Sequence, residues 1–214
     1  MNSASATSTP RETSLERAIS HGPTATVTAL DALRVARQAW LASGRIDMGA
    51  LAAELGVSRA TLYRWVGDRE RLLGEVLWSF AEPTIEEARA APGSGPDHIA
   101  EVVERYLRAA MAFEPVRRFI ELDPEFALRV LASKHSQMQR RSIAAIRDLL
   151  GEQTTSGALD PPLELDALAY VIVRICESFL YNDVITGGEP DVDQAVDAVR
   201  ALLHAPPVAS RAKT

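Results

Sequence analysis

The sequence predicts an all-α protein with about nine helices. Apolar residues recur three and four positions apart through most of the 214 residues, a spacing that places them on one face of a helix. The alternation of apolar and polar residues that is typical of half-buried strands does not persist anywhere. Residues that favour helix ends, mainly Asp, Ser, Thr, Gly and Pro, separate the apolar segments.

Length and composition allow either one compact body or a small domain joined to a larger one. The chain is 47% hydrophobic, which is enough to bury a sizeable core. No run approaches the roughly 18 apolar residues of a membrane span, and the N-terminus lacks the apolar region of a signal peptide. We therefore expect a cytoplasmic protein without membrane contact. The lone Cys176 cannot form an intrachain disulfide or a CxxC metal site, and we expect no cofactor and no metal.

The two ends of the chain are predicted to be flexible. Residues 1–27 are rich in Ser, Thr, Ala and Pro and show no sustained periodicity. The two cations of this arm, Arg11 and Arg17, each stand beside a glutamate, and composition favours a disordered tail. Residues 206–214 form a second flexible tail.

The first helix is expected to begin after Thr28 and to end at Gly44. Thr28 is a good N-cap, and Asp31 follows at the position that completes a capping box. The expected apolar face consists of Leu30, Leu33, Ala36 and Trp40.

The next two helices are predicted to form a helix-turn-helix. Asp47 and Ser58 are N-caps, and Gly56 between them can adopt the left-handed conformation that ends a helix sharply. Apolar residues at helical spacing would pack the two helices together: Leu51, Leu55, Val57, Leu62 and Val66.

The outer face of the second of these helices carries donors and flat rings, which suit a helix that enters the major groove. Gly67 and Asp68 then end this helix and cap the next, whose positive N-terminal end and Arg69 would face an anion. The net charge of -6 argues against an indiscriminate nucleic-acid binder, yet four arginines oppose two acidic residues between Ser58 and Leu73. The candidate DNA contacts are Arg59, Ala60, Thr61, Tyr63, Arg64, Trp65 and Arg69. The alternative, that Tyr63 and Trp65 only pack and the arginines are solvated, is less favoured because caps, turn and cations coincide.

The segment GVSRATLYRWVGDRERLL at residues 56–73 resembles the helix-turn-helix of the TetR family of bacterial repressors. The resemblance implies a three-helix DNA-binding domain over residues 28–73 and a ligand-binding and dimerisation domain over 74–205. It places Arg59, Ala60 and Tyr63 near base edges, and Thr61, Arg64, Trp65 and Arg69 mostly at phosphates. The chain departs from the pattern at Gly49, where the family often has a polar or basic side chain, and at Trp65, where it often has His. Gly49 removes one expected phosphate contact, whereas the indole N–H of Trp65 can still donate.

The larger domain is expected to contain five further helices and a short segment. One long helix should run from Arg69 to about Ala90, before the breaker sequence APGSGP. The others are expected from Asp97, over the short segment 114–122, from Asp123–Pro124 to Leu150, from Asp160–Pro161 to about Ile185, and from Asp191, with Gln194 completing a capping box.

A helix-turn-helix dimer matches a palindromic operator, so the chain needs a self-complementary surface. The last two long helices are the candidate surface, because in TetR relatives the corresponding helices pack against their copies. The alternative is that they merely cover the core of the monomer. Their apolar residues are Leu165, Leu168, Ile172, Ile175, Phe179, Val199, Leu202 and Leu203.

A ligand pocket is predicted in the larger domain. Arg174, Glu177, Ser178 and Tyr181 fall at i, i+3, i+4 and i+7 of a largely apolar helix, where burying them unpaired would be costly. They could orient a small apolar or amphipathic effector, or Arg174 and Glu177 could simply pair. The expected walls are Tyr106, Phe113, Phe119, His135 and Met138.

The segment FIELDPEFALRVL at residues 119–131 is similar to the QsdR-type branch of TetR regulators, which implies a lactone or acyl-lactone as inducer. We therefore expect a ligand-responsive, homodimeric repressor. Two alternatives are a ligand-binding scaffold without DNA affinity and an enzyme acting on a lactone. The four histidines have no ligand-like spacing and no catalytic motif is present, so the enzyme is disfavoured.

Overall fold

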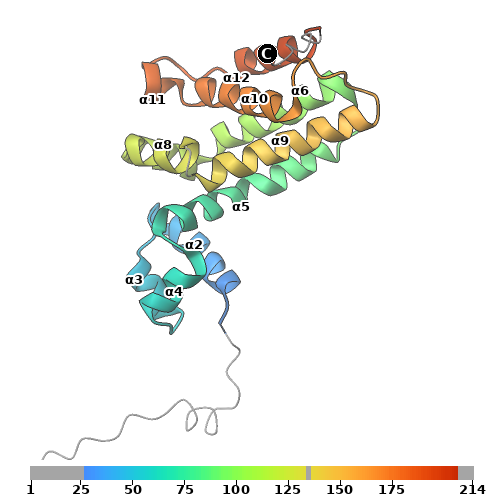
Figure 1. Cartoon of the computed structure of the whole chain (residues 1–214). Coiled ribbons are helices and arrows are strands. Elements are labelled where there is room, and N and C mark those ends of the chain that lie inside the picture. The colour runs from blue at the N-terminus through green and yellow to red at the C-terminus, as the bar shows by residue number, and fades with distance from the viewer. Residues whose placement is uncertain (1–26, 134–135, 207–214) are drawn as a thin grey trace, which may run out of the picture.

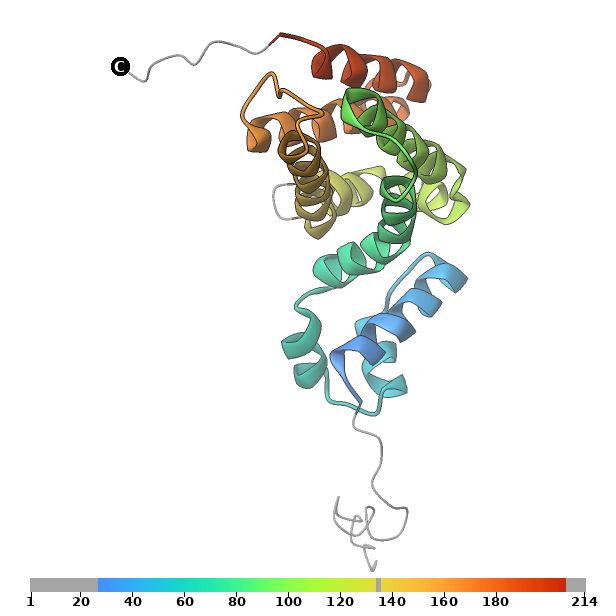
Figure 2. The same ribbon diagram turned by 90° about the vertical axis from the view of Figure 1, so that its right-hand side faces the viewer.

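The computed structural model describes residues 27–133 and 136–206, and within these ranges it consists of eleven α-helices without a strand (Figures 1 and 2). The all-α prediction is confirmed. The number of helices exceeds the expected nine because two of the expected helices are each divided in two. The predicted arm and tail lie almost entirely outside the described residues.

Three short helices lie together at one end of the molecule: α2 (Ala29–Ser43), α3 (Met48–Glu54) and α4 (Arg59–Val66) (Figure 1). The capping box at the start of α2 is formed, since Thr28 accepts from the Asp31 N–H and the Asp31 carboxylate accepts from the Thr28 N–H at 3.0 Å. Leu30 is wrongly placed on the apolar face, because its side chain is 76% exposed.

The helix-turn-helix forms through the expected caps. The Asp47 carboxylate accepts from the N–H groups of Gly49 and Ala50 at 2.7 and 2.9 Å, and the Ser58 hydroxyl accepts from the Thr61 N–H at 3.1 Å. Gly56 has a φ of +67°, which a residue with a Cβ rarely adopts. Leu51, Ala52, Leu55 and Leu62 are buried in one cluster, and Val57 and Val66 pack against it.

Helix α5 (Arg69–Arg89) starts beside the small group of helices and runs into the larger one, so that it connects the two (Figures 1 and 2). Asp68 caps it by accepting from the Arg71 N–H at 2.8 Å. The larger group contains α6 (Gly95–Ala112), α7 (Glu114–Leu122), α8 (Pro124–Ala132), α9 (Gln137–Thr155), α10 (Leu165–Leu180), α11 (Asn182–Thr186) and α12 (Val192–Leu203).

The predicted helix from Asp123 to Leu150 is divided into α8 and α9. Ser136 causes the break, because its hydroxyl donates to the Val130 carbonyl at 2.5 Å and accepts from the Gln139 N–H at 3.0 Å, which caps α9. A serine that caps a new helix competes with continuation of the preceding one. Helix α9 also continues past Gly151, since a glycine inside a helix costs only about 1 kcal/mol.

Two other predicted boundaries are wrong. Helix α6 is preceded by Ser94, and Asp97 lies in its first turn instead of at the cap. Helix α10 begins at Leu165, because Pro162 disfavours a helical backbone at Pro161. The same predicted helix is interrupted at Tyr181, whose φ of -107° and ψ of 23° separate α10 from α11.

The core forms two clusters of buried residues. One extends from the helix-turn-helix through Trp40 and Leu72 to Phe119 and Tyr181, so it links the two groups of helices. The other lies within the larger group and includes Ile99, Leu107, Leu168, Ile172, Val199 and Leu203. No helix in the described part of the chain is long and apolar enough to cross a membrane.

Candidate nucleic-acid interface and ligand cavity

Helix α4 has one buried side and one exposed side. Leu62 is 0% exposed, whereas Tyr63 on the neighbouring side is 48% exposed. Arg59, Ala60 and Arg64 are also exposed. Neither Arg59 nor Arg64 is paired with a carboxylate among the residues that the structure describes, so both guanidinium groups remain available to phosphates or base edges.

Two predicted contact residues have additional roles within the fold. The Thr61 hydroxyl lies 2.9 Å from the Ser58 hydroxyl at the start of α4. Trp65 is half-buried and packs against the core cluster that contains Leu62. Part of the Trp65 side chain therefore serves packing, as the alternative interpretation of this residue expected.

Gly49 provides space for Arg59. A Cβ atom at position 49 would lie 2.6 Å from Nη2 of Arg59, so any larger residue would displace the guanidinium. The pKa of Asp47 is held below its ordinary value, first by the N–H groups of Ala50 and Gly49 and then by the charges of Arg59 and Arg69. The glycine that lacks one phosphate contact thus leaves room for another cation at the start of α3.

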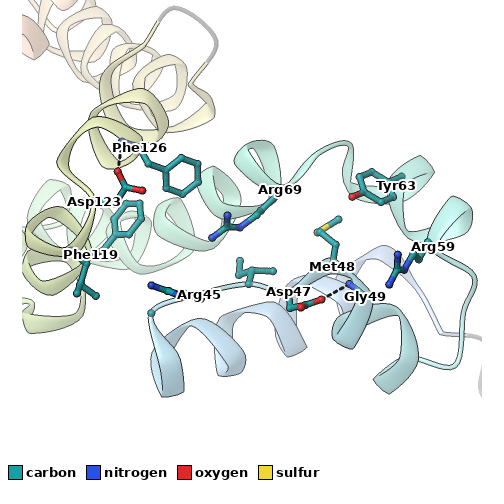
Figure 3. Close-up of a pocket in the computed structure, with 13 residues that line it drawn as sticks. Arg45, Asp47, Met48, Gly49, Arg59, Tyr63, Arg69, Phe119, Asp123 and Phe126 are labelled. Atoms are coloured by element: carbon teal, nitrogen blue, oxygen red, sulfur yellow. Dashed lines mark hydrogen bonds between the residues drawn. The ribbon is translucent and has the colours of Figure 1, made fainter.

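A junction cleft of about 570 Å³ separates the start of α3 from the start of α8 (Figure 3). Arg69 lies on one side with its Cζ 4.9 Å from the ring centroid of Phe126 on the other. Phe119, expected in the ligand pocket, lines this cleft instead. The remaining lining residues are Gly44, Arg45, Ile46, Asp47, Met48, Gly49, Arg59, Tyr63, Leu122 and Asp123.

A second cavity lies in the larger group of helices, has a volume of about 280 Å³ and is here called the effector cavity because the sequence predicts the ligand pocket in this part of the chain. Smaller hollows of about 50 and 150 Å³ adjoin it, and all three share Leu180 and Tyr181 in their walls. Of the residues predicted for the pocket, Tyr106, Phe113, Met138 and Tyr181 line the largest hollow, and Glu177 lines the smallest.

Three other predicted pocket residues are not part of these walls as described. Arg174 and Ser178 lie on the exposed side of α10, where the Ser178 hydroxyl donates to the Arg174 carbonyl at 2.8 Å. His135 lies outside the described residues. The sequence missed several apolar wall residues because their spacing is the same as that of ordinary core residues: Leu77, Phe80, Ala81, Ala109, Ala110, Leu131 and Leu180.

The hydroxyl and thiol groups in the walls are neutral. Tyr181 is 5% exposed, and neither its hydroxyl nor that of Tyr106 forms a hydrogen bond with another described residue. Burial raises the pKa of both phenols, which keeps them as hydroxyl donors. Burial also raises the pKa of Cys176 to about 12, so this residue stays a thiol.

Glu177 differs from the other polar wall residues because its carboxyl group titrates near neutral pH. Burial raises its pKa to about 7. The guanidinium of Arg174 opposes this rise only in part, although its Nη1 lies 2.5 Å from Oε2 of Glu177. Near neutral pH a fraction of the Glu177 carboxyl groups is therefore protonated and can donate a hydrogen bond.

Replacing Glu177 with glutamine should raise the melting temperature more at pH 8 than at pH 5. Because the folded-state pKa is about 7, above the ordinary 4.5, the folded protein binds more protons than the unfolded chain between these values. The free energy of unfolding of the wild-type protein therefore falls as pH rises through this window. Glutamine does not ionise, so the Glu177→Gln variant should not show this fall. The difference in melting temperature between variant and wild type is measured by thermal unfolding at both pH values. Each kcal/mol of added stability should raise the melting temperature by about 2–4 °C.

The matched control is Glu189→Gln, in an exposed loop, whose effect should be small at both pH values. An equal shift for Glu177→Gln at pH 5 and pH 8 would show that burial does not perturb this carboxyl.

Comparisons with known proteins agree with this geometry. Residues 94–204 match the family model described as "Tetracyclin repressor-like, C-terminal domain". The structure is similar to that of the transcriptional repressor QsdR from R. erythropolis, with 32% identity, a TM-score of 0.76 and coverage of 86% of this chain and 97% of that one. It also resembles the TetR family repressor AlkX from Dietzia sp. strain DQ12-45-1b, with 22% identity, a TM-score of 0.52 and coverage of 82% and 91%.

A sequence comparison with curated proteins gave no significant match. The family model covers more than half of the chain, and the similarity to QsdR extends over 86% of it. The proteins on which these matches rest are regulators and not enzymes. The chain belongs to the TetR family of ligand-responsive, DNA-binding transcriptional regulators.

Proposed function

We propose that the protein is a homodimeric repressor that binds a palindromic operator and releases it when a small amphipathic molecule enters the effector cavity. Residues 28–73 would form the DNA-binding domain and residues 74–205 the effector and dimerisation domain, acting in the cytoplasm. The observation that carries the proposal is the pairing of an exposed, cationic α4 with a separate cavity that contains unpartnered hydroxyl groups.

The DNA-binding part of the proposal rests on α4. Its N-terminal turns would present Arg59, Ala60 and Tyr63 to base edges, and Thr61, Arg64 and Trp65 would lie near backbone phosphates. A two-fold dimer would place two such helices in successive major grooves, about 34–36 Å apart. Arg69, whose guanidinium lies over the Phe126 ring, would add a phosphate contact beside α4.

The effector part rests on the chemistry of the cavity. Tyr106 and Tyr181 offer hydroxyl donors in the cavity, and Glu177 in the adjoining small hollow offers a further donor when protonated. A lactone has ester oxygens that accept such hydrogen bonds and carries no charge to bury, and the apolar walls suit an acyl or alkyl chain. A lactone or acyl-lactone therefore fits the cavity better than an anion does.

The dimer would form through the outer faces of α10 and α12. Four of the eight apolar residues first expected there, Leu168, Ile172, Val199 and Leu203, are buried inside the protomer. The exposed stripe of α10 instead contains Ala167 and Tyr170, and Tyr170 is 51% exposed. An exposed aromatic ring on the protomer surface suits a symmetric contact between two subunits.

Tyr170→Glu should convert the dimer to a monomer. Two copies of the new carboxylate would meet near the two-fold axis and lose both the ring contact and their hydration. Analytical ultracentrifugation measures the state directly. Leu41→Glu is the matched control, because Leu41 is 48% exposed on α2; that variant should stay dimeric. A Tyr170→Glu variant that remains dimeric would place the interface elsewhere.

DNA binding is tested by a gel shift with the region upstream of the protein's own gene. We expect a specific complex at about 50 mM salt that weakens steeply as salt is raised. Failure to bind any palindromic fragment at low salt would contradict the proposal and favour a ligand-binding protein without DNA affinity.

A further inference from the structure

We propose that Trp40 is the positioning residue through which the effector cavity sets the orientation of the helix-turn-helix. This inference rests on the proposed function, because it concerns how occupation of that cavity is transmitted. It concerns five rings, here called the aromatic junction: Trp40, Phe80, Phe113, Phe119 and Phe126.

Two rings of the aromatic junction are walls of the effector cavity. Phe80 on α5 and Phe113 after α6 both line it, and their centroids lie 5.3 Å apart. Trp40, on α2, contacts both from the opposite side, at 5.6 Å from Phe80 and 6.3 Å from Phe113. The cavity wall and the DNA-binding part of the protein are therefore separated by a single layer of rings.

Helix α2 holds Phe80 with a second side chain. The guanidinium of Arg37 lies 4.6 Å from the centroid of the Phe80 ring. Arg37 and Trp40 are three residues apart and so lie on the same face of α2. Two side chains of α2, Arg37 and Trp40, therefore contact the Phe80 ring. If Phe80 moves, α2 either resists the movement or moves with it.

The rings continue from Trp40 to the start of α5. Trp40 lies 6.2 Å from Phe119, Phe119 lies 5.9 Å from Phe126, and Phe126 lies beneath Arg69. The aromatic junction thus reaches from the effector cavity to the junction cleft of Figure 3, where Arg59 also lies.

Trp40 is firmly attached to the helix-turn-helix. It is 1% exposed and belongs to the same buried cluster as Leu51, Leu55 and Leu62. Its carbonyl accepts from the Gly44 N–H at 2.7 Å, which ends α2 just before the turn to α3. A displaced Trp40 must therefore carry with it the end of α2 and the elements that pack on it.

The indole N–H of Trp40 has no hydrogen-bond partner among the described residues. A buried donor without an acceptor is costly and calls for an explanation. A second arrangement of the ring that gives this N–H an acceptor would recover that cost, so the position is suited to an element with two states.

The small size of the cavity explains why a bound effector would move these rings. At about 280 Å³ it lies just below the usual range for ligand sites, about 300–1,000 Å³. A larger effector must displace a wall, and close-packed interiors transmit such displacements. Because Trp40 contacts both Phe80 and Phe113, a movement of these rings toward α2 would press on Trp40.

The test replaces the unidentified effector with a side chain. Ala110 lines the cavity, and Ala110→Leu fills part of it. This change is combined with Trp40→Leu in a double-mutant cycle. Trp78→Leu is the matched control background, because Trp78 is also buried but lies outside the cavity walls and bonds to Glu82 at 2.9 Å.

Two measurements are made on each full-length variant: the Kd for the upstream DNA fragment and the hydrogen exchange of the α3 and α4 amides. In the wild-type and Trp78→Leu backgrounds, we expect Ala110→Leu to change Kd about tenfold and to alter exchange. In the Trp40→Leu background, the change in Kd should be less than about twofold. Equal effects of Ala110→Leu in the Trp40→Leu and Trp78→Leu backgrounds would overturn the inference.

A failure of the proposed function is distinguishable from a failure of this inference. If the wild-type protein binds no DNA, the proposed function fails, while hydrogen exchange still tests transmission. If Trp40→Leu does not fold, the emission of Trp40 alone is measured in a Trp65→Phe, Trp78→Phe variant. Ala110→Leu should shift that emission, and an unchanged emission would overturn the inference.

Discussion

Leu62→Ala is expected to destabilise the helix-turn-helix and to abolish DNA binding. Leu62 is 0% exposed and packs α4 against the cluster of α2 and α3. Removing a buried leucine side chain costs about 2–5 kcal/mol, because the cavity that remains closes only in part. Such a cost is a large fraction of the total stability of an ordinary domain. The free energy of unfolding, obtained from urea titration followed by circular dichroism, measures it.

Leu41→Ala is the matched control for this prediction. Leu41 is the same residue type on α2 but is 48% exposed, so its truncation should change stability by less than about 0.5 kcal/mol. Comparable losses in the two variants would mean that Leu62 does not occupy the core of the helix-turn-helix.

Arg59→Ala should weaken operator binding by about 10- to 100-fold and leave the dimer and the melting temperature unchanged. Arg59 is exposed, its guanidinium lies beside Gly49 at the start of α3, and it would read a base edge. Loss of one such contact costs about 1–3 kcal/mol and relaxes specificity at that position. Fluorescence anisotropy with operator and unrelated DNA measures both effects.

Arg118→Ala serves as the control for Arg59→Ala, since Arg118 is an exposed arginine on α7, away from α4. It should leave operator affinity within about twofold of wild type. If Arg59→Ala weakened operator and unrelated DNA by the same factor, the residue would contact phosphate and not a base.

The helix-turn-helix could be predicted in detail because its signals are local. Asp47, Ser58 and Asp68 each accept a backbone N–H two or three residues away, and Gly56 adopts a positive φ. These signals depend on neighbours in the sequence, which can be read without the fold. The role of Gly49 was only half predicted, because the position of Arg59 depends on contact between two helices.

The larger group of helices was predicted less well because its boundaries depend on distant contacts. Ser136 ends one helix and starts another through a bond to the Val130 carbonyl six residues away, and serine alone does not indicate this. The walls of the cavity also escaped prediction in part. Phe80 and Phe119 have the same apolar character, yet only the packed structure assigns Phe80 to the cavity and Phe119 to the junction cleft.

Arg174 and Ser178 show the limit of helical spacing as a guide to a pocket. Together with Glu177 and Tyr181 they form one stripe in the sequence, but α10 is covered on only part of its surface. Arg174 and Ser178 consequently face outward, while Glu177 and Tyr181 are buried. The direction in which a helix is covered is set by its neighbours and not by its own pattern.

The central claim, that a ligand in the cavity controls DNA binding, is tested most directly by titrating the dimer onto its operator with and without a lactone. N-octanoyl homoserine lactone and γ-decalactone are suitable probes, because both combine an uncharged ester ring with an apolar chain. We expect saturating lactone to raise the Kd for the operator at least tenfold, with no such effect in a Tyr106→Phe, Tyr181→Phe variant. An operator Kd that is the same with and without either lactone would contradict the proposed control by this class of ligand.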